Sequence, residues 1–276
     1  FIRLKTRRKQ RLSGAENLFF RVHGFTKRRL FLFGQSVWFW RQQHIFGMAM
    51  ATVNPNIRIT TTVRFDTDAG TGGKILKQTL KQQSGIDARR LSRLSLIAAL
   101  GAGQLKEQSE IRSDCAVFLG TPFSSPSVFE KMADNVLNHH AAMPFDFIAN
   151  LHNAPVFHAA QALGTHGATL VVAVDNNMDT CFHPLLLAMQ SLQNGGQAAV
   201  GWAYEHQAAH ADTHEGSIWI VLEAGAEQGV PVVLNDEGTQ TDRPSENPQY
   251  YWQNIADWIE AVMAHEGRVV KKCTLA

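Results

Sequence analysis

The chain has 276 residues, of which 45 % are hydrophobic and 18 % are charged, as is typical of a soluble globular protein with a sizeable core. Its three cysteines, Cys115, Cys181 and Cys273, form no CxxC pair. This odd number and these spacings exclude a disulfide framework and a zinc ribbon, and they favour a reducing cytoplasm.

The net charge of +2 is unevenly distributed. Residues 1–47 carry eleven Lys and Arg against one acid, Glu16, whereas residues 48–276 carry a net charge of −8. Three interpretations of this basic arm stay open. It is a tail that binds nucleic acid or a membrane, an Arg-rich targeting peptide, or sequence from outside the natural protein, because Met48 and Met50 stand just before the first predicted strand.

We therefore divide the chain into a basic extension, 1–50, expected to be disordered or non-native, and a folded domain, 51–276. The apolar stretch 30–40 is too short to span a membrane, because a spanning helix needs about 20 residues.

The first half of the domain alternates strand patterns with helix patterns. Strands are predicted over 57–65, where β-branched residues alternate, and over 115–120, a continuous apolar run. Helices are predicted over 76–83, 88–105 and 127–138. Gly85 should end the first of these helices, and Asp87 should cap the second.

The second half continues the alternation, with strands predicted over 169–174, 198–204 and 217–223 and helices over 153–163, 178–193 and 250–265. Asn153 is the expected N-cap of its helix. The helix at 178–193 should be buried nearly all round, and Pro184 in its first turns should delay its start or kink it. The strand at 169–174 should lie inside the sheet. Strands that alternate with helices predict an α/β layered fold with a mixed sheet.

Several short motifs follow one another along the domain. Arg90 and Arg93 begin a Leu-rich helix, and the next strand ends in Leu119-Gly120-Thr121. Asn153-Ala154 opens a small apolar helix, and Leu163-Gly164 and Gly167 lead into the following strand. With these motifs in this order, residues 57–225 resemble the N-terminal half of β-ketoacyl synthases. The resemblance implies a thiolase-like half, which is a mixed five-stranded sheet covered by helices.

The chain departs from the family at the nucleophile. Counted forward from Gly167, Asn176 occupies the position of the acyl-carrying cysteine. Cys181 lies five residues further on, away from the helix N-terminus that lowers the pKa of a thiol. No Gly-His-Thr or Gly-Thr-Gly-Thr segment follows residue 225. The resemblance therefore implies no catalytic residue and no cofactor, and a noncatalytic subunit like the short chain-length-factor-like proteins of type II fatty-acid and aryl polyene pathways.

The implied partner is a full-length, Cys-containing β-ketoacyl synthase in a heterodimer, with contact to an acyl carrier protein left open and no nucleic acid expected. The candidate residues for the interface or an acyl channel are His152, Asn153, Phe157, Val171, Val172 and Met178. Without the second half of the family's fold, the helix at 178–193 would expose an apolar face. Either the partner or the helix at 250–265 would cover it.

Other chemistry has weaker support. His206, His210 and His214 have the spacing of helical metal ligands but lie in a loop between strands, so we expect no metal site. The sequence contains no G-x-S-x-G elbow and no phosphate-binding glycine loop. Two alternatives remain: a divergent acyltransferase or condensing enzyme with another nucleophile, and a module that binds membrane or nucleic acid through the basic arm.

Overall fold

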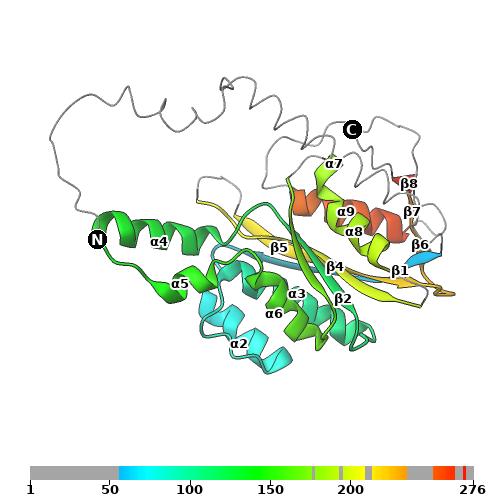
Figure 1. Cartoon of the computed structure of the whole chain (residues 1–276), viewed down its shortest axis with the longest axis horizontal. Helices are drawn as coiled ribbons and strands as arrows, with labels where there is room; N and C mark the ends of the chain where they lie inside the picture. The colour runs from blue at the N-terminus through cyan, green and yellow to red at the C-terminus, as the bar shows by residue number, and fades with distance from the viewer. Residues whose placement is uncertain are drawn as a thin grey trace, which may run out of the picture. The chain divides into compact units, whose positions relative to one another are not determined.

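A six-stranded mixed sheet lies at the centre of the domain (Figure 1). The computed structural model describes residues 56–175, 178–192, 195–208, 213–234, 251–264 and 270–271. The strands of the sheet are β1 (Ile57–Asp68), β2 (Ala116–Thr121), β3 (Thr169–Ala173), β4 (Gln197–Tyr204), β5 (His214–Ala224) and β6 (Val230–Pro231). Their order across the sheet is β3-β2-β4-β5-β1-β6. β7 (Val233–Leu234) and β8 (Val270–Lys271) form a separate parallel pair.

Strand β2 is parallel to both of its neighbours, β3 and β4. The remaining pairs, β4 with β5, β5 with β1 and β1 with β6, are antiparallel. The predicted α/β fold with a mixed sheet is confirmed. The sheet has six strands instead of the predicted five because the short strand β6 pairs with β1.

Helices cover both faces of the sheet (Figure 1). One face carries α2 (Gly73–Ser84), α3 (Arg93–Gln108) and α6 (Ala154–Leu163), and the other carries α7 (Met178–Cys181), α8 (His183–Ser191) and α9 (Tyr251–Ala264). The remaining two, α4 (Pro126–His139) and α5 (Pro144–Ala149), lie at one end of the domain. No helix within the described ranges is both long enough and apolar enough to cross a membrane.

The core lies on both faces of the sheet, around strands β4 and β5, whose side chains are almost all buried. Trp202, Trp219 and Trp252 are fully buried in it. Glycine is needed where the Trp219 ring crosses β4, because a Cβ at Gly201 would lie 2.5 Å from ring carbons of Trp219. A Cβ at Gly101 of α3 would similarly lie 2.3 Å from the Ser217 hydroxyl. Two glycines therefore let α3, β4 and β5 pack closely around one indole.

The predicted strand at 169–174 lies at the edge of the sheet, so the expectation of an interior strand is wrong. Thr169, Leu170 and Ala173 are exposed, while Val171 and Val172 are partly buried. The strand itself is confirmed, but its predicted burial is wrong, because an apolar run indicates a strand without determining which elements lie beside it.

The predicted helix at 178–193 is divided into α7 and α8, with Phe182 between them. Pro184 lies in the first turn of α8, where its missing N–H needs no partner, so a new helix begins there as the sequence indicated. Most of α8 is buried, as predicted.

The expected exposed face of this central helix is absent from the described structure because α9 covers it. Side chains of α8 and α9 belong to one hydrophobic cluster, and the Phe182 and Trp258 rings meet edge to face with centroids 4.6 Å apart. Of the two alternatives in the sequence, the C-terminal helix is therefore the cover.

Two local predictions at helix ends have different outcomes. Gly85 ends α2 with φ 70°, as expected for a left-handed C-cap. Asp87 does not cap α3: it binds Arg89, and the N-cap is Ser92, whose hydroxyl accepts the Ser95 N–H at 3.2 Å. The predicted boundary at residue 50 lies outside the described residues and stays a prediction.

We expect Gly201→Ala to lower the free energy of unfolding by about 1–3 kcal/mol, because the added methyl group overpacks the Trp219 site. Gly73→Ala is the matched control, since a Cβ there meets no atom within 4 Å. It should raise stability by about 0.4–1 kcal/mol by restricting the unfolded chain. Urea denaturation measures both, and equal effects of the two substitutions would contradict the packing argument.

Candidate functional site

The carboxyl ends of the three parallel strands lie together at one end of the sheet, which is the usual position of ligand sites in α/β proteins. β2, β3 and β4 end there at Thr121, Ala173 and Tyr204. The predicted nucleophile position follows β3 directly, but Asn176 lies outside the described residues. α7 begins at Met178, whose side chain also lies outside the described part.

Two described residues on either side of the predicted nucleophile position, Asp175 and Thr180, bind each other. The Thr180 hydroxyl donates to the Asp175 carboxylate, and the Asp175 N–H donates back to Thr180 Oγ1 at 3.4 Å. The next residue, Cys181, is 2 % exposed and lies in the core, where its carbonyl accepts the Trp202 indole N–H at 2.6 Å. Its sulfur is thus enclosed by the hydrophobic cluster shared by α8, α9 and the sheet.

The other described cysteine, Cys115, is also buried. Burial raises the pKa of its thiol to about 12. Since the thiolate is the reactive form of cysteine, Cys115 is chemically inert at neutral pH.

The candidates at the start of α6 lie close together in the chain but do not form a catalytic group. Burial lowers the pKa of the half-buried His152, and its Nε2 atom has no hydrogen-bond partner among the described residues. Phe157 is 56 % exposed and contacts the His158 ring edge to face. Phe157 therefore belongs to the outer surface of the helix.

Asn153 directly precedes α6, at the N-cap position as predicted, but its side chain makes no capping hydrogen bond. Its backbone is helical, with φ −86° and ψ −5°, instead of the extended conformation that directs a capping side chain at the next turn. Pro155 also removes one of the N–H groups that such a cap would bind.

Strand β3 presents its outer backbone edge without a neighbouring strand in the described structure. Val171 packs toward the α3 and α6 layer and Val172 toward the α8 layer, so the strand is anchored from both faces. Leu170 is 43 % exposed. An apolar strand with a free edge favours pairing with a strand of another chain.

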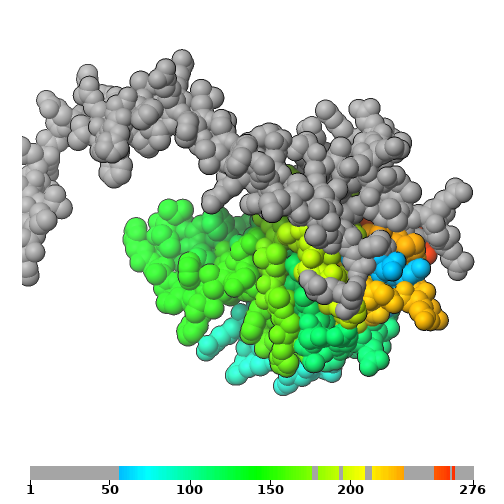
Figure 2. All heavy atoms as spheres, turned by 45° about the vertical axis from the view of Figure 1, so that its right-hand side comes forward, coloured from blue at the N-terminus to red at the C-terminus, as the bar shows by residue number. Residues whose placement is uncertain are grey.

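Most of the exposed hydrophobic side chains lie in the segment of the chain that leads into β3. Ten of the eleven large hydrophobic side chains that are exposed in the described residues lie between residues 129 and 170. They are Phe129, Val136, Leu137, Met143, Phe145, Phe147, Ile148, Leu151, Phe157 and Leu170, and we call them the apolar surface. The green segment that carries α4 and α5 projects from the domain in Figure 2. So many exposed hydrophobic residues in one segment mark a site of interaction.

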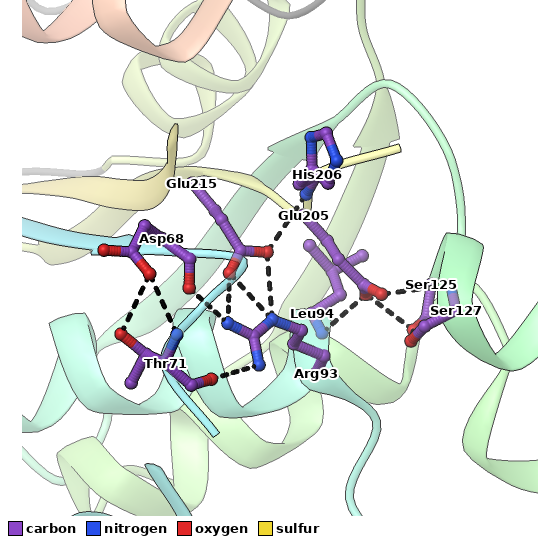
Figure 3. A network of polar contacts seen from close by, with 9 residues as sticks. All are labelled: Asp68, Thr71, Arg93, Leu94, Ser125, Ser127, Glu205, His206 and Glu215. Carbon is purple, nitrogen blue, oxygen red and sulfur yellow. Dashed lines mark hydrogen bonds and ion pairs between the residues drawn. The ribbon is translucent and has the colours of Figure 1, made fainter. Parts of the chain in front are cut away.

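A network of buried carboxylates lies at the carboxyl ends of the parallel strands (Figure 3). Glu205 follows β4 directly and is 1 % exposed. Its Oε2 atom accepts the Leu94 N–H at 2.9 Å and the Ser125 hydroxyl at 2.6 Å, and its Oε1 atom accepts the Ser127 N–H at 3.1 Å. One carboxylate thus binds the first turns of both α3 and α4, where N–H groups have no partner within the helix.

The second carboxylate, Glu215 of β5, is also 1 % exposed and pairs with Arg93 at the start of α3. Arg93 Nε lies 2.7 and 3.0 Å from the two Glu215 oxygens. The guanidinium also donates to the backbone carbonyls of Thr71 at 2.8 Å and Asp68 at 2.6 Å. The Glu215 charge is thus neutralised by hydrogen bonds that join α3, β5 and the loop after β1.

This network was missed in the sequence, where only Arg90 and Arg93 were noted. A signal existed, because Glu205 directly follows the eight residues of β4, which are nearly all apolar. A carboxylate in such a position is buried and therefore needs donors.

No group of three His, Cys, Asp or Glu side chains in the described ranges could hold a metal ion. Of the three loop histidines, His210 lies outside those ranges, and His214 is the first residue of β5.

Burial raises the pKa of the Glu205 carboxyl, although hydrogen bonds from Ser125 and Ser127 act in the opposite direction and the Glu215 charge adds to the rise. The folded protein therefore binds this proton more tightly than the unfolded chain does. The free energy of unfolding should fall as pH rises from the ordinary glutamate pKa, about 4.3, through the raised value. Glu205→Gln should remove this part of the pH dependence. Urea denaturation between about pH 4 and pH 8 measures it, and identical profiles for the two proteins would contradict the prediction.

Comparison with known proteins gives structural similarity without sequence similarity. No family model and no curated protein sequence matches the chain. A chain in the complex of the ketosynthase ApeO with its chain length factor ApeC, from Xenorhabdus doucetiae, superposes with a TM-score of 0.54 and 15 % identity. The superposition covers 79 % of this chain and 95 % of that one.

Two further structures are less similar. The ishigamide ketosynthase/chain length factor gives a TM-score of 0.43 at 14 % identity, over 64 % of each chain. A type II polyketide synthase acyl-carrier protein in complex with its ketosynthase, AntDE:AntF, gives 0.44 at 10 % identity, over 62 % of this chain and 63 % of that one. The first superposition carries the conclusion: the domain has the thiolase-like fold of ketosynthase complexes.

Proposed function

We propose that the chain is a noncatalytic, chain-length-factor-like subunit that forms a heterodimer with an active β-ketoacyl synthase in type II fatty-acid, polyene or polyketide biosynthesis. One observation carries the proposal: β3 has no neighbouring strand on its outer side among the described residues, and ten exposed hydrophobic side chains lie in the segment 129–170 that leads into it and includes its Leu170. The location that fits this role is the cytoplasm.

The free edge lacks hydrogen-bond partners, and the apolar surface lacks a protein surface that shields it from water. β3 offers unpaired backbone groups on its outer side, and a partner with the same fold offers an equivalent strand. Antiparallel pairing of the two strands about a two-fold axis would satisfy both edges and would bring the apolar surface against the partner. Burial of apolar area then stabilises the complex, while the strand pairing fixes its register.

The superposition supports a short subunit in particular. The matched chain is aligned over 95 % of its length by 79 % of this chain, so it is no longer than this chain. It comes from a complex that contains a ketosynthase and its chain length factor.

The chemistry of the chain supports a noncatalytic role. Asparagine at position 176 cannot form a thiolate, and the two described cysteines are buried. The enzyme alternative, a divergent acyltransferase or condensing enzyme, needs a nucleophile elsewhere. The other alternative, binding of membrane or nucleic acid through residues 1–47, concerns residues outside the described part.

Contact with an acyl carrier protein is a second element of the proposal. Lys77, Lys81 and Arg89 line an open groove of about 520 Å³ between α2 and the loop before α3, with Asp87 as its acid. The excess of positive charge suits an acidic partner surface.

We expect the chain to co-purify from its native cells with a full-length ketosynthase in a 1:1 complex, identified by mass spectrometry and sized by light scattering. Phe157→Lys and Leu170→Lys should each weaken this complex by about tenfold or more, because each buries an unpaired charge in the interface. Ile75→Lys is the matched control: Ile75 is 60 % exposed but lies on α2, outside the apolar surface. A monomer that binds no ketosynthase, or equal weakening by all three substitutions, would contradict the proposal.

The isolated protein should form no acyl-enzyme when it is mixed with acylated carrier protein, because it offers no accessible thiolate at the described cysteines. Intact-protein mass spectrometry measures the added mass. Iodoacetamide labelling of the native protein should likewise leave Cys115 and Cys181 unmodified. Stable acylation at Cys181 would support the enzyme alternative instead.

A further inference from the structure

Helices α4 and α5 form an arm, residues 126–149, that packs little against the domain. In α4, Pro126 alone among the described side chains is buried, and α5 has no buried residue. Within the arm, the Lys131 ammonium pairs with the Asp146 carboxylate at 2.9 Å. A helix of this length is marginally stable in water unless tertiary contacts support it. The position of the arm therefore depends on a few attachments.

Two contacts among the described residues attach the arm, one in α5 and one at the start of α4. In α5, the Arg90 guanidinium lies over the Phe145 ring, 4.3 Å from the ring centroid, and Arg90 is exposed. At the start of α4, Ser125 is 2 % exposed and binds the fully enclosed Glu205 (Figure 3). An exposed contact of the first kind contributes little, whereas a hydrogen bond to a buried charge contributes more.

Glu205 joins the N-termini of two helices, and we call this arrangement the clasp. Its carboxylate accepts the N–H of the second residue in each of two helices, Leu94 in α3 and Ser127 in α4. α3 is buried along most of its length, so it forms the fixed side. α4 contributes no comparable packing, so Glu205 joins a rigid helix to a weakly packed one.

We infer that Glu205 is a positioning residue, which fixes the direction of the arm by holding the N-terminus of α4 to the N-terminus of α3. The arm carries Phe129, Leu137, Phe145 and other members of the apolar surface. The purpose of the clasp rests on the proposed function: it presents these side chains to the partner in one orientation, which reduces the entropy lost on binding.

Two substitutions separate the clasp from general stability. Ser125→Ala removes one of the two donors to Glu205 from the start of α4 and leaves the Ser127 bond and the Leu94 bond to α3 intact, so it weakens the hold of Glu205 on α4. Glu205→Gln places an amide NH₂ opposite at least one N–H or O–H donor, whichever way the amide is turned, because both carboxylate oxygens accept from donors. Ser217→Ala is the matched control, since it removes a buried hydrogen bond of 3.1 Å to Ile97 in the middle of α3, away from the arm.

Hydrogen–deuterium exchange of the isolated full-length protein tests the inference without any partner. Backbone amides of residues 126–149 should exchange about five- to tenfold faster in Ser125→Ala and Glu205→Gln, while amides of α3 and β4 keep their protection. Ser217→Ala should leave exchange in the arm unchanged. If Glu205→Gln does not fold, Ser125→Ala decides alone.

Unchanged exchange of the arm in Ser125→Ala, or an equal increase in Ser217→Ala, would overturn the clasp. The purpose is tested separately, by the affinity of Ser125→Ala for the ketosynthase partner. We expect a lower affinity, and an unchanged affinity together with faster exchange would overturn the role of the arm in binding. Failure of the proposed function would instead appear as no complex with the unsubstituted protein, while the exchange results would stand.

Discussion

The parallel pairing of β2 with both β3 and β4 is the constraint on which the rest of the domain depends. It brings the carboxyl ends of three strands to one end of the sheet, and the helices that precede or follow those strands begin at that end. Helix N-termini that gather in one place bring N–H groups and positive dipole ends together. The buried Glu205 and Glu215 carboxylates supply the acceptors and negative charge that this arrangement requires.

The same constraint explains why one face of the sheet is covered by helices of this chain while the outer edge of β3 has no neighbouring strand among the described residues. α9 covers the central helix through Trp258 and neighbouring apolar residues, so that face is complete within the chain. On the side of β3, no described element covers Leu170 or Phe157. Two of the exposed hydrophobic residues thus lie on β3 and on α6, which packs beside it, and most of the others lie on the α4–α5 segment.

The sequence predicted those features that depend on local rules. The five main strands follow from β-branched alternation or apolar runs, Gly85 ends its helix in the left-handed conformation, and Pro184 starts a new helix. These predictions succeeded because each depends on the backbone conformation of a few neighbouring residues.

Features that depend on distant contacts were not predictable in the same way. The edge position of β3 depends on which strand lies next to β2, and the strand's own residues do not encode it. Asn153 has the residue type of a cap but the wrong backbone conformation for one. Glu205 acts through Leu94 and Ser125, which lie 111 and 80 residues away in the chain. The nucleophile position, Asn176, was read from the family resemblance and lies outside the described residues.

The exposed edge of β3 also has a consequence for the chain before it meets a partner. Two copies can present the same edge to each other, so self-association would compete with the heterodimer that we propose. The balance would follow mass action and shift toward self-association when the chain is made in excess. The proposed function thus requires matched synthesis of the two subunits.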